Sequence, residues 1–343
     1  MRIAVWLTIA VAAIGAAPAQ SECLAGQPAS ARKPQLAPLP DAAPAPDDNP
    51  TTPEKSALGR LLFFDPRLSG DNTMSCATCH LPDKAWGDAL PKAKGAGGKE
   101  LARNTPSLMN VGFYQTLFWD GRSASLEQQA LVPIESPDEM NQNADALVDE
   151  LAAVPQYRKQ FESVFGRPVN KDDVARALAA FQRTLVSRNS PFDRYLAGDK
   201  EALSPQAQKG LELFRGEAGC IRCHDGPLLS DGKFYRIGIG ITIGSGDKGR
   251  GAITGERDDL YSFRTPSLRD VAHTAPYMHD GSLATLYDVV EFYYRGVPTR
   301  GPDGLELDVA PLVGQSFTEI DPLVEFLKSL SGEPPDITPP ELP

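Results

Sequence analysis

The sequence contains a Cys-x-x-Cys-His run twice, and this repetition constrains the fold more than any other feature. It reads Cys-Ala-Thr-Cys-His at 76–80 and Cys-Ile-Arg-Cys-His at 220–224. The run is the attachment signature of c-type haem, in which two thiols add to the haem vinyl groups and the adjacent histidine binds the iron. We therefore expect two covalently held haem c groups. The residues that would hold them are Cys76, Cys79, His80, Cys220, Cys223 and His224.

Two other interpretations of paired cysteines explain less of the pattern. Four thiols could form a structural zinc site, but zinc accounts neither for the histidine after each pair nor for an exported chain. A thioredoxin-like redox pair is expected beside a βαβ pattern, and no such pattern surrounds either run. Haem attachment explains both runs together.

The first 19 residues predict a secretory signal peptide. A basic start precedes a short apolar run and small residues near Ala17-Pro18-Ala19, which is the expected order for such a peptide. No later run of about 20 apolar residues follows, so we expect no membrane span and a periplasmic location. Cys23 is the odd cysteine, and we expect a free thiol there, with lipid attachment as the alternative.

The remaining chain is long enough for two domains. We expect a disordered Pro/Ala-rich lead-in at 20–53, a first haem domain at 54–195, a second at 196–333 and a frayed tail at 334–343. The net charge of −11 argues against nucleic acid and anionic membranes as partners. It permits a basic electron-transfer partner.

Apolar periodicity and capping residues predict a mainly α fold. No sustained strand alternation occurs, and two glycine-rich segments, 84–99 and 238–255, predict loops. The helix before the second haem run mirrors the helix before the first, so the two halves look duplicated. Helices are expected from Thr52 through Phe63 and at 123–131, 143–153, 171–186, 204–214, 283–294 and 318–330.

The supply of iron ligands differs between the two halves. The chain has four histidines; two belong to the haem runs, and the others, His273 and His279, lie late in the chain. The first haem therefore has no second histidine nearby, which predicts an open coordination position where peroxide can bind. The alternative is that Met109 or a late histidine closes that position.

Several further motifs resemble the bacterial di-haem cytochrome c peroxidases, and more closely their MauG-like branch. The resemblance covers about residues 54–332. It implies two cytochrome c-like domains, each with one haem c, and a reaction with hydrogen peroxide at the first haem. Besides both haem runs it rests on Arg-Asn-Thr-Pro-Ser-Leu at 103–108, Phe-Trp-Asp-Gly-Arg at 118–122, Pro-Ile-Glu-Ser-Pro-Asp-Glu-Met at 133–140, Arg-Thr-Pro-Ser-Leu-Arg at 264–269 and Pro-Tyr-Met-His-Asp-Gly at 276–281.

The resemblance implies roles around the first haem. Glu139 corresponds to the distal acid, and Gln129 and Pro133 to residues that line its pocket. Trp119 corresponds to a tryptophan between the haems. A positioned carboxylic acid can move a proton between the oxygens of bound peroxide. Without the resemblance, Glu139 reads as a surface carboxylate and Trp119 as core packing.

The resemblance also implies a calcium site and a residue beside the second haem. Asn104, with the backbone carbonyls of Thr274 and Pro276, matches a calcium site that bridges the two domains. His279 matches a histidine near the second haem.

The sixth ligand of the second haem separates the chemistries within the family. Tyr293 lies where the peroxidases have a methionine and MauG has a tyrosine, and Met278 is the competing ligand. Methionine raises a haem potential, whereas an anionic tyrosinate favours higher-valent iron.

The implied function is a periplasmic peroxide-dependent oxidation of a protein partner, such as the quinoprotein precursor in which MauG makes tryptophan tryptophylquinone for methylamine dehydrogenase. Two alternatives remain: a peroxidase fed by a small cytochrome or cupredoxin, and a non-catalytic di-haem electron carrier. One departure concerns Ala218, which stands where MauG has the tryptophan that passes electrons from its bound protein substrate.

Overall fold

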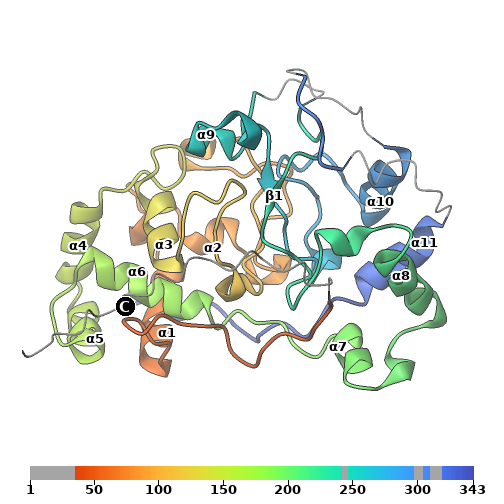
Figure 1. Cartoon of the computed structure of the whole chain (residues 1–343). Coiled ribbons are helices and arrows are strands. Elements are labelled where there is room, and N and C mark those ends of the chain that lie inside the picture. The colour runs from red at the N-terminus through yellow and green to blue at the C-terminus, as the bar shows by residue number, and fades with distance from the viewer. Residues whose placement is uncertain (1–34, 242–245, 297–303, 310–318) are drawn as a thin grey trace, which may run out of the picture. The chain divides into compact units, whose positions relative to one another are not determined.

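The computed structural model describes residues 35–241, 246–296, 304–309 and 319–343. The expected signal peptide, Cys23 and the start of the lead-in lie outside these residues. Within them the chain is mainly helical, with a single two-stranded sheet, which confirms the predicted fold class (Figure 1).

The described residues form helices and two short strands, with the following bounds. The helices are α1 (Pro53–Phe64), α2 (Cys76–Cys79), α3 (Leu126–Glu135), α4 (Ala144–Ala153), α5 (Pro155–Phe165), α6 (Lys171–Gln182), α7 (Pro191–Leu196), α8 (Pro205–Arg215), α9 (Gly251–Thr254), α10 (Leu286–Arg295) and α11 (Ile320–Lys328). The strands β1 (Phe234–Tyr235) and β2 (Phe263–Arg264) pair antiparallel.

The predicted helices are present, with differences at their ends. α6 stops at Gln182 rather than at Val186, and the Thr184 hydroxyl bonds the carbonyl of Phe181 just beyond it. α5 and α7 were not predicted, because α5 follows directly on α4 and α7 has only six residues. α9 lies within the second glycine-rich segment.

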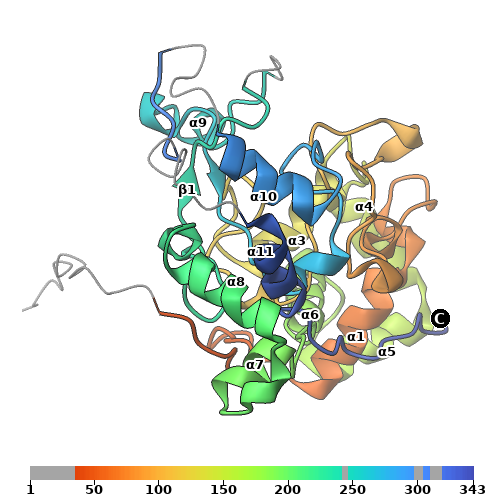
Figure 2. The same cartoon turned by 90° about the vertical axis from the view of Figure 1, so that its right-hand side faces the viewer.

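Each half contains one close helix crossing. α1 packs on α6, and α8 packs on α11 (Figure 2). A Cβ at Gly59 would overlap the carbonyl oxygen of Ala177, and a Cβ at Gly210 would overlap that of Pro322. Both crossings therefore need glycine at the contact, which places α1 and α8 in equivalent positions.

Each crossing belongs to its own apolar core. The first core draws its buried residues from Leu58 to Leu185, and the second takes Leu36 and residues from Phe192 to Leu330. We call residues 53–185 the first half and 191–330 the second half. The proposed domain boundaries at 54, 195 and 333 stay a prediction.

The halves meet through reciprocal hydrogen bonds between equivalent segments. The Asn104 amide donates to the carbonyl of His279, and the Arg264 amide donates to the carbonyl of Trp119, both at 2.8 Å. These four residues come from the four motifs that repeat between the halves, at 103–108, 118–122, 264–269 and 276–281. The repeated motifs thus form the junction itself.

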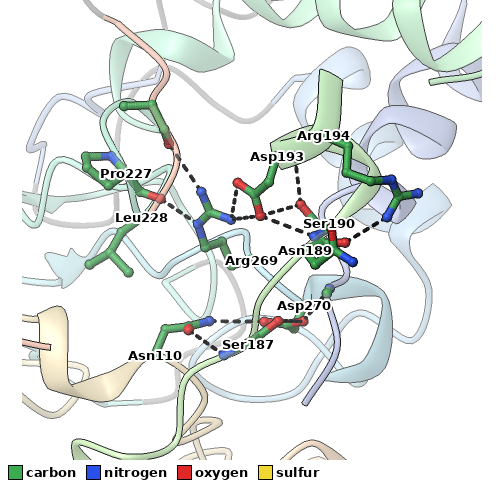
Figure 3. Close-up of polar contacts among 12 residues, drawn as sticks. Asn110, Ser187, Asn189, Ser190, Asp193, Arg194, Pro227, Leu228, Arg269 and Asp270 are labelled. Atoms are coloured by element: carbon green, nitrogen blue, oxygen red, sulfur yellow. Dashed lines mark hydrogen bonds and ion pairs between the residues drawn. The ribbon is translucent and has the colours of Figure 1, made fainter. Parts of the chain in front are cut away.

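A buried polar cluster extends this junction (Figure 3). Asn110 Nδ2 donates to Asp270 Oδ2 at 3.0 Å, and Ser187 Oγ donates to Asp270 Oδ1 at 2.7 Å. The Ser187 amide also donates to Asn110 Oδ1 at 3.0 Å. Asn110 and Asp270 both have a left-handed φ near +60° and both precede a short 3-10 helix. Satisfied buried polar groups of this kind specify one arrangement of the two halves.

Both ends of the described chain contact the helical body. The carbonyl of Gln35 accepts from the Gly226 amide at 2.8 Å, and Leu36 is buried in the second core. At the other end, Ile337 packs against the first core, and Arg67 donates to the carbonyl of Pro343 at 3.0 Å.

Candidate functional site: a cavity lined by both haem motifs

A cavity of about 970 Å³ is lined by residues of both Cys-x-x-Cys-His runs. Its walls are mainly apolar, with a few polar side chains, as is usual for cofactor sites. The structure brings every predicted site residue to this cavity: Cys76, Cys79, His80, Asn104, Trp119, Gln129, Pro133, Glu139, Cys220, Cys223, His224, Thr274, Pro276, His279 and Tyr293.

The first haem run forms α2 and ends in an oriented histidine. His80 Nδ1 lies 2.9 Å from the carbonyl of Trp86. Because a carbonyl only accepts, Nδ1 carries the proton and Nε2 keeps its lone pair for a metal. The Trp86 indole is buried against Phe63 and Phe181, so core packing fixes the carbonyl that orients His80.

The second haem run repeats this arrangement. His224 Nδ1 lies 2.9 Å from the carbonyl of Leu229, and Leu229 is buried. Burial lowers the pKa of both His80 and His224, which keeps the imidazoles neutral and able to bind iron.

The four cysteines of the two runs are unpaired with one another. Burial raises the pKa of Cys76 and of Cys220 to about 12. Protonated thiols of this kind are poor nucleophiles, so the site is not built for thiolate catalysis. Two thiols beside each oriented histidine, on one apolar cavity, fit the attachment of one haem c at each run.

Glu139 lies in the turn that follows α3. Its amide donates to the Ser136 carbonyl at 3.1 Å, and the next amide, that of Met140, donates to the Pro133 carbonyl at 3.1 Å. Burial raises the pKa of Glu139, against the opposing charge of Arg122. A half-buried carboxyl with a raised pKa can hold and release a proton nearer to neutral pH.

Trp119 is fixed at both its side chain and its backbone. The indole Nε1 donates to the carbonyl of Asn104 at 3.0 Å, and the backbone carbonyl accepts from Arg264 across the junction. The same Asn104 bonds His279 through its amide. Asn104 therefore connects the cavity-lining indole of the first half to the backbone of His279 in the second half.

The helices α3 and α10 present equivalent faces to the cavity. Each has ten residues and a capping hydroxyl at its start, from Ser125 in α3 and from Thr285 in α10. Pro133 and Tyr293 are each the eighth residue of their helix, and both line the cavity. A tyrosine thus stands in the second half where the first half has a proline, which has no ligand atom.

Tyr293 lies beside the second haem run. Burial raises the pKa of its hydroxyl, and the nearby Cys223 and Cys220 add to this shift. Met278 and Ala218 also line the cavity, and Ala218 is buried.

His279 is held by stacking rather than by charge. Its ring lies 3.6 Å from that of Phe263, centroid to centroid, at an angle of 14°. Burial lowers the pKa of His279 to about 4, so the imidazole is neutral at physiological pH. His273, by contrast, is exposed and is not among the cavity residues.

Sequence reasoning missed a charged cluster beside Trp119. Arg103 binds Asp247 through two nitrogens, at 2.7 and 2.9 Å, and Asp120 through a third at 2.6 Å. Burial alone would lower the pKa of Arg103, but the hydrogen bonds that it donates to Asp247 and Asp120 raise the pKa above its usual range. Only the position of Arg103 beside Asn104 in a repeated motif hinted at this cluster.

The described residues contain no group of three or more His, Cys, Asp or Glu side chains that could hold a metal ion. The predicted calcium ligands are instead neutral oxygens. Asn104 Nδ2 donates to the Leu90 carbonyl at 2.8 Å, which leaves Oδ1 as its ligand atom. Amide and carbonyl oxygens suit calcium. In the described part of the chain, no helix is both long and apolar enough to cross a bilayer.

Comparison with known proteins agrees with this geometry. Residues 53–201 match the family model described as di-haem cytochrome c peroxidase. The methylamine utilization protein MauG of Methylorubrum extorquens is 45% identical over 299 residues, covering 86% of this chain and 83% of that relative. The cytochrome c551 peroxidase of Pseudomonas aeruginosa is 38% identical, covering 86% and 83%.

A solved structure agrees as well. A MauG-like protein associated with microbial copper homeostasis superimposes with a TM-score of 0.77 at 34% identity, covering 86% of this chain and 95% of that one.

Identity above 30% over most of both chains, together with the two oriented haem runs on one cavity, establishes the relationship. The chain belongs to the di-haem cytochrome c peroxidase family, as a MauG-like, peroxide-dependent oxidoreductase with two haem c groups.

Proposed function

We propose that hydrogen peroxide reacts at the haem held by His80, and that electrons reach it from a protein partner through the haem held by His224. One observation carries this proposal: both haem runs line one cavity, together with Glu139, Trp119 and Tyr293. The overall change is the reduction of one peroxide to two waters with two protons and two electrons. The partner supplies the electrons and is oxidised.

A haem held by His80 would supply the iron at which peroxide is reduced, while side chains of the protein move protons and position the peroxide. Glu139 takes the proton from the near oxygen of peroxide and delivers it to the far oxygen. Its raised pKa suits both acceptance and release of that proton. Gln129 and Pro133 line the space beside it.

Trp119 is the proposed intermediate site for electron transfer between the two haems. Its indole is fixed by Asn104 and its backbone by Arg264, so little reorganisation accompanies a change in its charge. The Arg103 cluster lies against the next residue, Asp120, and adds to this rigidity.

Tyr293 is the proposed sixth ligand of the second haem. Its equivalence to Pro133 supports a closed second site and an open first site, since only tyrosine offers a ligand atom. Because the pKa of the free hydroxyl is raised by burial, iron binding has to supply the stabilisation of the tyrosinate.

Replacing Tyr293 by Phe tests this ligand. We expect the low-spin spectrum of the ferric second haem to change, while Met278→Leu leaves it unaltered. Low-temperature electron paramagnetic resonance of both purified variants, at equal haem content, gives the comparison. If only the Met278 variant had an altered low-spin spectrum, Met278 would be the ligand instead of Tyr293.

The proposed partner is a periplasmic protein that is oxidised at a distance. A quinoprotein precursor is the MauG-type candidate, since two relatives bear the name methylamine utilization protein. Ala218, where MauG has its electron-passing tryptophan, favours a different exit or a different protein.

Because Ala218 replaces the tryptophan of MauG, a second function, peroxidase activity with a small electron-donor protein, is the alternative. A small cytochrome or cupredoxin could feed electrons directly to the second haem, as the name cytochrome c551 peroxidase implies for one relative. A non-catalytic carrier would have no use for a cavity-lining acid with a raised pKa. Turnover of peroxide with reduced cytochrome, against oxidation of a protein precursor, separates the two catalytic functions.

We further propose calcium at the junction, held by Asn104 Oδ1 and the carbonyls of Thr274 and Pro276. These three residues come from both halves and line the same cavity. A cation there would link the two halves close to the hydrogen bond between the Asn104 amide and the His279 carbonyl.

A further inference from the structure

We propose that the hairpin of residues 94–100 is a positioning element for Glu139, and that Gly95 is its point of contact. The inference rests on the proposed role of Glu139 and extends it. The hairpin lies at the end of the glycine-rich segment 84–99, and none of its residues has a role in the proposed function.

The hairpin is a closed structure. Lys94 pairs with Glu100 in an antiparallel bridge, and the Gly95 amide donates to the Lys99 carbonyl at 2.8 Å. One residue outside each end of the hairpin, the Leu101 amide donates to the Ala93 carbonyl at 2.8 Å. The base of the hairpin is therefore fixed.

The hairpin rests directly on the backbone that carries Glu139. A Cβ at Gly95 would overlap the carbonyl oxygen of Asp138 and would lie 3.1 Å from Glu139 Cα. The Ala96 amide donates to the same Asp138 carbonyl at 3.2 Å, and Lys99 Nζ forms an ion pair with the Asp138 carboxylate. Three contacts thus converge on Asp138, immediately before Glu139.

The same turn is held from its other end by a second glycine. The Gly70 amide donates to the Met140 carbonyl at 2.9 Å, and a Cβ at Gly70 would overlap the carbonyl oxygen of Asn141. Glu139 therefore sits between two fixed backbone contacts. These contacts fix the backbone from which the Glu139 side chain extends.

The hairpin also reaches the first haem run. Cys79 Sγ lies 3.7 Å from the Lys94 carbonyl. Through residues 94–96 the hairpin thus spans from a haem attachment point to the proposed acid. Because a displacement of about 1 Å can cost 10²-fold in rate, the spacing that this hairpin fixes matters for proton transfer.

Glycine at 95 is required by this contact and not by backbone strain. Its φ of −100° is open to any residue, so only the overlap with Asp138 excludes a side chain. Gly97 provides the matched case, since it has a φ of +64° and a Cβ there would meet nothing within 4 Å. Alanine at 97 strains the hairpin tip without touching the turn.

The test compares Gly95→Ala with Gly97→Ala in the haem-loaded protein. We expect Gly95→Ala to slow the reaction with peroxide by at least about tenfold and Gly97→Ala to leave it within about twofold of wild type. A second readout needs no turnover: the Kd of fluoride for the ferric protein, followed by absorption. We expect it to rise in Gly95→Ala alone, because protonated Glu139 donates to the bound anion.

Combination with Glu139→Gln separates this inference from the role of Glu139. If the hairpin acts through Glu139, Gly95→Ala adds no further loss of peroxide rate in the Glu139→Gln background. Equal, independent losses in both backgrounds, or an unchanged rate and fluoride Kd in Gly95→Ala, would overturn the inference. An unchanged rate in Glu139→Gln alone would instead overturn the proposed distal acid.

The charged groups around Glu139 are the same in both glycine variants. Arg122 lowers its pKa and Asp138 raises it, while Lys99 pairs with Asp138. None of these charges changes in either glycine variant, so a difference between the variants reports position.

Discussion

Glu139→Gln is expected to slow the reaction with peroxide by about 10²–10⁴-fold, the range that positioned acid–base groups supply. Glutamine keeps the size of the side chain but cannot accept a proton. Both haems should stay attached, since Glu139 is not among the cysteines and histidines that would hold them. Stopped-flow absorption after mixing with peroxide measures the rate, and the pyridine haemochrome spectrum gives the haem content.

The pH dependence supplies an internal check on this result. Burial raises the pKa of Glu139, and only its deprotonated form can take the first proton from peroxide. The wild-type rate should therefore fall as pH drops through a value above the usual range of glutamate. In Glu139→Gln the peroxide rate should no longer fall at low pH. If the Glu139→Gln variant kept both the wild-type rate and its fall at low pH, the acid–base role of Glu139 would be refuted.

Pro133→Tyr is expected to close the first haem. Pro133 and Tyr293 occupy the same position in two equivalent helices, so a tyrosine at 133 should reach the first haem as Tyr293 is proposed to reach the second. The high-spin ferric signal should be lost, and the peroxide rate should fall by at least about 10²-fold, since the substrate then has to displace a ligand.

Pro133→Ala is the matched control for this substitution. It restores the missing N–H inside α3 and removes the pyrrolidine ring, but it adds no ligand atom. We expect it to keep the high-spin signal. Retention of that signal in Pro133→Tyr would mean that the two helices do not present equivalent positions to their haems. Its loss in Pro133→Ala would mean that proline acts by its shape.

Local signals in the sequence predicted much of this architecture. The haem runs are contiguous, and helix starts such as Thr52 and Ser204 carry both a capping side chain and a following proline. These features depend on neighbours in the chain, so the sequence alone contains them.

The remaining features depend on tertiary placement. The carbonyls of Trp86 and Leu229 orient the two histidines, yet a backbone acceptor has no side-chain signature. The reciprocal bonds of Asn104 and Arg264 join segments far apart in the sequence. In the sequence, Gly95 is one glycine in a glycine-rich segment, and only the structure shows that it packs against Asp138.

The most direct test of this account is electron paramagnetic resonance of the ferric protein before and after one equivalent of peroxide, with optical spectra of the same samples. We predict one high-spin and one low-spin haem, no methionine–iron charge-transfer band, and loss of both ferric signals to a long-lived oxidised product. Two low-spin haems with a methionine band, unchanged by peroxide, would contradict it.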